Sequence, residues 1–184
     1  MTESRRLLDI YLRDHRAGAV AGRRLAKRLA KENLESQWAM LHKVAREIQE
    51  DETTLDIAMR MLGVTEAVLK NLAAVAIEKV GQLKPNGRLL SYSPLSRVVE
   101  LESLMSGIVA KRRLWVSLRQ FALDHNSLPG IDFEKLEARA ADQLSTLASL
   151  HEKAARMAFS AAEEIASIEP DSISHVGQMR SEPV

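Results

Sequence analysis

Hydrophobic residues recur every three or four positions along four long stretches of the chain, which is the spacing of one face of an α-helix. The stretches cover roughly residues 4–31, 34–62, 94–123 and 133–168. In the second stretch the apolar positions alternate in steps of three and four, as in packed helix bundles, and they are Leu41, Ala45, Ile48, Leu55, Met59 and Leu62. The pattern therefore predicts an all-helical protein.

Residues with strong capping preferences mark several expected helix ends. We expect Gly63 to end the second helix, Ser93 to cap the third with Pro94 at its first position, and Asp132 to cap the fourth. Residues 65–83 carry a shorter apolar repeat, which predicts an extra helix in the connection between helices two and three. The layout predicts a four-helix bundle with one long connection, and a five-helix up-and-down bundle is the alternative.

Length and composition fit one helical domain. A chain of 184 residues with 46% hydrophobic residues is long enough to bury one substantial core, which we assign to residues 1–168. Residues 169–184 have no sustained periodicity, and we expect a flexible tail there. Cysteine is absent, which excludes disulfides and thiolate chemistry. No stretch resembles a signal peptide or a membrane span, so we expect a cytoplasmic protein with no membrane partner.

Basic residues are concentrated at the start of the chain. The net charge is only +1, yet residues 1–31 hold nine Lys and Arg against three Asp and Glu. Helical spacing predicts a basic face made of Arg13, Arg16, Arg24, Lys27 and Lys31. Because aromatic residues do not interleave it, we expect a solvated face or one that meets another subunit. Nucleic-acid association through this face is a weaker alternative.

A few ionisable residues share a stripe with apolar positions, where an unpaired charge would be costly to bury. Asp14 lies among the apolar and small residues that we assign to the inner face of the first helix, which are Leu7, Tyr11, Gly18, Ala21, Leu25 and Leu29. Glu52, Glu102 and His151 hold equivalent places on the other three helices, and His15 lies at the edge beside Asp14. The candidate buried polar or metal layer is therefore Asp14, Glu52, Glu102, His151 and His15. Its carboxylates would bind a metal or pair with arginines such as Arg112.

Three stretches together resemble the ferritin-like superfamily, and more narrowly its small bacterial stress-associated bundle proteins. They are LLDIYLRDHRAGAVAGRRLAKRLA, VAREIQEDETTLDIAMRMLGV and NGRLLSYSPLSRVVELESLMSGIVAKRRLWVSLRQFA. The resemblance implies a four-helix bundle whose di-iron site would use two Glu residues and two Glu-x-x-His pairs. None of the five histidines here follows a Glu by three positions. The standard di-iron motif is therefore lost, and a non-standard iron or manganese carboxylate site remains an alternative.

The sequence has no phosphate-binding glycine loop, nucleophile elbow, dinucleotide fingerprint or HExxH motif. We therefore expect a non-enzymatic protein without a cofactor that acts through a protein partner, most simply as a homo-oligomer. Trp38, Met40, Met59 and Met61 support this expectation because not all four can face one core. Gly18 and Gly22 of the first helix predict either close helix packing or room for a ligand.

Overall fold

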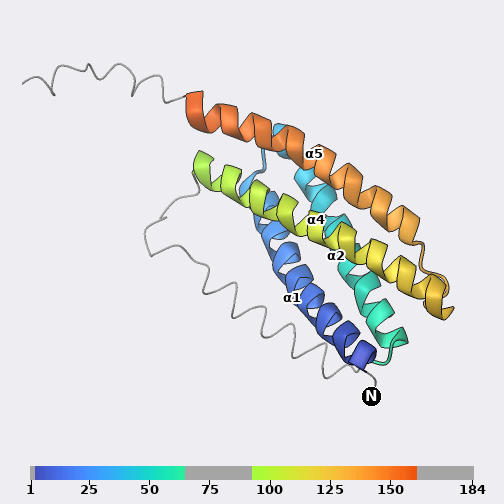
Figure 1. Cartoon of the computed structure of the whole chain (residues 1–184). Helices are drawn as coiled ribbons and strands as arrows, with labels where there is room; N and C mark the ends of the chain where they lie inside the picture. The colour runs from blue at the N-terminus through green and yellow to red at the C-terminus, as the bar shows by residue number, and fades with distance from the viewer. Residues whose placement is uncertain (1–2, 65–92, 161–184) are drawn as a thin grey trace, which may run out of the picture.

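The computed structural model describes residues 3–64 and 93–160, and within these ranges every regular element is helical (Figure 1). The long helices are α1 (Glu3–Glu32), α2 (Met40–Met61), α4 (Pro94–His125) and α5 (Phe133–Phe159). A short 3₁₀ helix, Ser36–Trp38, lies between α1 and α2. The prediction of an all-helical bundle is confirmed for the part of the chain that is described.

The expected capping residues hold the helix ends. Gly63 has a φ of 81° and donates to the carbonyl of Arg60, while Val64 donates to that of Met59, which together form a Schellman motif at the end of α2. Ser93 directly precedes Pro94, the first residue of α4, and its hydroxyl accepts from the amide of Ser96. The Asp132 carboxylate accepts from the amide of Lys135 at 2.9 Å. Glycine supplies the left-handed turn, and the short polar side chains satisfy free amides at the helix starts.

Contacts between helix ends fix the direction of each helix. Arg5 of α1 donates to the carbonyl of Leu62 at the end of α2, so α1 and α2 are antiparallel. The Tyr11 hydroxyl donates to Ser117 at 3.3 Å, and Arg97 donates to Asn33, so α1 is also antiparallel to α4. It follows that α2 and α4 run in the same direction, and the end of α2 and the start of α4 lie at opposite ends of the bundle (Figure 1).

Two sequence predictions fall outside the described ranges. The extra helix predicted for residues 65–83 lies there, and so does the tail predicted for residues 169–184. The stretch of the fourth predicted helix beyond residue 160 also lies outside.

The apolar interior is divided into two cores. One core lies toward the end of the bundle that holds Trp38, and its buried members include Leu29, Leu101 and Leu147. The other lies toward the opposite end, around Leu12 and Trp115. Each core contains side chains from all four long helices. Because one core lies toward each end of the bundle, the two cores are stacked along its axis.

The inner face of α1 differs from the predicted one. Its buried residues are Leu12, Arg16, Val20, Ala26, Leu29 and Ala30. Of the stripe predicted to face inward, Leu29 is buried and Tyr11, Ala21 and Leu25 are partly buried, whereas Leu7 is 59% exposed and Gly18 is also exposed. The predicted inner face is partly wrong because the observed inner face carries Arg16 at a position where the apolar pattern predicts an apolar residue.

Candidate functional site: a polar layer of ion pairs

A layer of polar side chains separates the two apolar cores. Its most deeply buried members are Arg16 of α1, Asp51 and Glu52 of α2, and Gln143 of α5. Arg16, Asp51 and Glu52 lie along their helices between positions of one core and positions of the other, whereas Gln143 lies within the core on the Trp38 side, between Ala140 and Leu147. We call these four residues, with Lys111 of α4 and Arg23 and Arg139 at its edges, the polar layer.

One half of the polar layer joins α1 to α2. Glu52 is 8% exposed, and its Oε1 accepts from Arg16 Nη1 at 2.8 Å while its Oε2 accepts from Arg23 Nε. Arg16 turns its remaining donors to Asp56, with Nη2 at 3.0 Å from Oδ2 and Nε bonded to Oδ1. A planar guanidinium can bond two carboxylates at once, so one buried arginine fixes two turns of α2 against α1.

The other half joins α2 to α4 and α5. Asp51 is only 2% exposed and accepts from Lys111 and from Arg139. Lys111 also donates to Gln143 Oε1 at 2.6 Å, and Gln143 Nε2 donates to Glu47 at 3.1 Å. Burial lowers the pKa of Lys111, whereas the Asp51 carboxylate acts in the opposite direction. Because α2 and α5 make little direct contact, these long side chains form much of the link between them.

The positions of Lys111 and Gln143 in the sequence explain why they face the polar layer. Lys111 follows Ile108 by three residues and precedes Trp115 by four, which is the step of an inward-facing helical stripe. Gln143 lies in the same way between Ala140 and Leu147. These residues could have been found from the sequence, because a cation or amide on an apolar stripe is as informative as an acid. The predicted layer contains only acids and histidines, with Arg112 as an example of a partner, and it therefore omits Asp51 as well as Lys111 and Gln143.

Of the five predicted layer residues, only Glu52 belongs to the polar layer. Asp14 is exposed, which corrects the prediction that it lies inside, because the inner face of α1 is rotated away from it. Glu102 is exposed as well, and it pairs with the partly exposed His151 at 2.9 Å on the surface between α4 and α5. The predicted convergence of the four long helices on one acidic layer is therefore wrong.

His15 is partly buried at the edge of α1. Its ring meets Tyr11 edge-on, with the ring centroids 4.4 Å apart. Burial lowers the pKa of His15, and the neighbouring Asp14 carboxylate raises it by less. The sequence predicts His15 at the edge of the inner face of the first helix, and its partly buried position agrees with that prediction. Neither His15 nor Asp14 belongs to the polar layer.

The predicted basic face and the predicted arginine partner also change. Arg16 is buried against Glu52 and leaves the basic face, whereas Arg13, Lys27 and Lys31 are exposed and Arg24 is partly exposed. Arg112 is exposed, so it is not the partner of a buried carboxylate. That role belongs to Arg16 and Arg23, because they face α2 at the height of Glu52.

The polar layer does not fit a di-iron site. Within residues 3–64 and 93–160, no three or more Asp, Glu or His side chains gather in a way that could hold a metal ion. The buried carboxylates Asp51 and Glu52 instead bond to guanidinium and ammonium groups. Two iron ions would have to displace those cations, so we derive no metal chemistry from this layer.

The sequence predicts that Trp38, Met40, Met59 and Met61 do not all face one core, and two of the four are exposed. Trp38 and Met59 are fully buried, whereas Met40 and Met61 are nearly half exposed. The guanidinium of Arg97 lies 4.4 Å from the Trp38 ring centre, and the ammonium of Lys153 lies 5.7 Å from it. This cation–π stack ties the starts of α2 and α4 to the end of α5.

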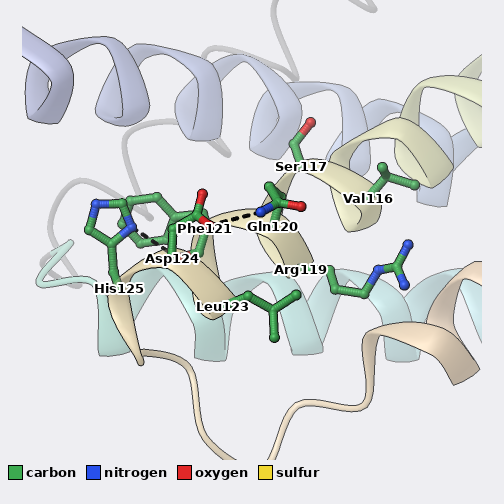
Figure 2. A pocket seen from close by; sticks show the side chains of 8 residues that line it. All are labelled: Val116, Ser117, Arg119, Gln120, Phe121, Leu123, Asp124 and His125. Carbon is green, nitrogen blue, oxygen red and sulfur yellow. Dashed lines mark hydrogen bonds between the residues drawn. The ribbon is translucent and has the colours of Figure 1, made fainter.

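A hollow of about 600 Å³ borders the last turns of α4. All the described residues that line it belong to this one helix, and Figure 2 shows their side chains pointing in several directions around it. Gln120 bonds to Asp124 at 2.8 Å, and His125 lies against the Phe121 ring, so these polar groups engage their own helix. The hollow therefore lacks the convergent polar groups of a ligand pocket.

None of the described helices combines the length and the apolarity needed to cross a lipid bilayer. Comparisons of the chain with protein-family models, with curated proteins and with solved structures found no match.

Proposed function

We propose that this protein is a non-enzymatic, ferritin-like helical bundle that acts by binding another protein, in the first instance a second copy of itself. The observation that carries the proposal is a set of exposed apolar side chains gathered at one end of the bundle. The direction of the helices and the chemistry of the polar layer support it.

The helix directions agree with the ferritin-like assignment. That fold has one long connection between its second and third helices, which leaves those two helices parallel. In this protein α2 and α4 are parallel, and each is antiparallel to α1. A four-helix up-and-down bundle would have made α2 and α4 antiparallel. A five-helix up-and-down bundle with a helix in residues 65–83 would give the same directions as those seen here, so the parallel pair supports a long or helical connection between α2 and α4.

The polar layer favours a role without catalysis. Asp51 and Glu52 each accept two charged donors, so their lone pairs are engaged by the protein itself. A buried carboxylate held in this way is a poor base and a poor metal ligand. A buried ion-pair network of this kind can fix which helix faces meet, which is a structural task.

The apolar end is formed by residues of α2, α4 and α5 and of the turn between α1 and α2. Leu34 is 78% exposed and Phe159 is 55% exposed. Leu95, Met40 and Met157 are also exposed there. The Trp38 stack with Arg97 and Lys153 brings the segments that carry them together. We assign these residues to a protein contact because they lie at the same end of the bundle, whereas isolated exposed apolar residues are common on any surface.

The test is the mass of the protein in solution at micromolar concentration. We expect sedimentation equilibrium to give an oligomer, and the double variant Leu34→Glu/Phe159→Glu to weaken association by roughly tenfold or more, because charges would enter an apolar contact. The matched control is Leu123→Glu, which puts a charge on a 73% exposed leucine at the opposite end. A strictly monomeric wild type, or an equal effect of the control, would overturn the proposal.

A further inference from the structure

The charged residues of α1 are sorted into rows along the helix. Arg6, Arg13, Arg24 and Lys31 are separated by seven, eleven and seven residues, which are close to two, three and two whole turns. These four therefore share one line along the helix, and Lys27 lies next to it between Arg24 and Lys31. We call these five residues the basic row.

The basic row has no counter-charge within the described part of the chain. None of its five cations forms an ion pair there, and all but the partly exposed Arg24 are exposed. The four arginines of α1 outside the row, Arg5, Arg16, Arg23 and Arg28, are each bonded to a carboxylate. The fold thus uses some of the cations of α1 to hold the bundle and leaves this row for the surface.

The acidic residues of α1 do not neutralise the row. Asp9 is paired with Arg5 at 3.1 Å. Glu3, Asp14 and Glu32 are separated by eleven and eighteen residues, which are close to three and five whole turns, so they share a different line. That line lies about a quarter of a turn around the helix from the basic row.

The acids of the neighbouring helix α2 do not neutralise the basic row, because they are engaged by other parts of the protein. Glu52 and Asp56 bond to Arg16 of α1, and Glu50 and Asp51 bond to Arg139 of α5. The fifth acid of α2, Glu47, accepts from Gln143. Arg46 of α2 is left exposed, with no ion pair among the described residues.

We propose that the basic row, together with Arg46, binds the phosphate backbone of a nucleic acid without reading its sequence. The row extends over about 37 Å, at about 1.5 Å for each residue from Arg6 to Lys31. A straight line of cations of this length meets several phosphates and releases their counterions, which is the source of sequence-independent affinity. Four of the six cations are arginines, whose planar fork matches phosphate oxygens. No aromatic side chain stands in the row to stack on a base.

The experiment measures binding of the full chain to a fluorescently labelled DNA duplex of mixed sequence, by anisotropy, from about 50 to about 200 mM salt. We expect the affinity to fall steeply as salt rises, and to be the same for a duplex of unrelated sequence. Arg13→Glu/Lys27→Glu should weaken binding by roughly tenfold or more and lower the salt slope by about two. Both positions are exposed, so circular dichroism melting should change little.

The matched control is Arg112→Glu/Arg113→Glu, which reverses two exposed cations on α4 and makes the same change in net charge. We expect it to keep most of the wild-type affinity. Absence of binding at low salt, or an equal loss in the two double variants, would overturn the proposal. Displacement of the duplex by polyglutamate at the same charge concentration would also overturn it, because the row would then select acidic polypeptides.

Discussion

At the scale of single residues, Glu52 shows how this interior tolerates charge. Its two oxygens accept from two different arginines, and one of those arginines also bonds to Asp56. A buried carboxylate without such donors would cost several kcal/mol, so the cations of α1 are required once an acid is placed on the inner face of α2.

Replacement of Glu52 by Gln tests this account. The substitution keeps the side-chain shape but removes the negative charge, and it replaces one of the two acceptor oxygens by an NH2 donor that faces an arginine. We expect the free energy of unfolding to fall by about 3 kcal/mol, because breaking a buried ion pair leaves uncompensated charge. Urea unfolding followed by circular dichroism measures the loss.

Glu102→Gln serves as the control for Glu52→Gln. Glu102 is exposed and pairs only with His151, so we expect a loss below about 1 kcal/mol. Equal losses in the two variants would show that burial does not set the strength of the pairs in the polar layer.

At the scale of elements, α1 departs furthest from a simple amphipathic helix. Its inner face carries Arg16, while its outer side carries Gly18. A Cβ atom added at Gly18 or Gly22 would meet nothing within 4 Å. The close packing predicted for these glycines is therefore absent from the described helices, and each glycine leaves α1 less stable than alanine would.

We expect Gly18→Ala and Gly22→Ala each to raise the free energy of unfolding by about 1 kcal/mol, the difference in helix propensity between the two residues. Thermal and urea unfolding check the result. Gly63→Ala is the control, and it should destabilise because Gly63 has a φ of 81° in the Schellman motif of α2. A loss of stability at Gly18 or Gly22 would instead show that another part of the protein packs on this side of α1.

At the scale of the whole molecule, the polar layer lies between two apolar cores and links all four long helices. The apolar cores supply most of the driving force for folding, since aliphatic burial is non-directional and scales with area. The ion pairs supply direction, because Asp51 can meet Lys111 and Arg139 in one register only. The polar layer thus selects one arrangement of the helices among those that packing of apolar faces alone would permit.

This layer also leads to a prediction for metal content. We expect the protein purified from cells grown with added iron and manganese to contain well below one metal ion per chain, because cationic side chains already occupy its buried carboxylates. Elemental analysis by mass spectrometry gives the ratio directly. Stoichiometric iron or manganese that survives dialysis would contradict the reading of the polar layer as a purely structural network.

The sequence by itself determined the helices. Apolar spacing fixed their number in the described ranges, and Gly63, Ser93, Pro94 and Asp132 fixed their ends. These features are local, because capping and propensity depend on a few neighbouring residues. For the same reason Glu52 could be recognised as an interior acid, since it lies between Ile48 and Leu55 on a clear stripe.

The tertiary structure alone decided which charges meet. Arg16 and Glu52 are 36 residues apart, and Lys111 and Asp51 are 60 apart, so no local pattern pairs them. The rotation of α1 about its own axis turned Asp14 outward and Arg16 inward, and it followed from the partners that α2 offered. Long-range electrostatics and packing act only once the helices are assembled, which is why the pairing of charges within the polar layer could not be read from the order of residues.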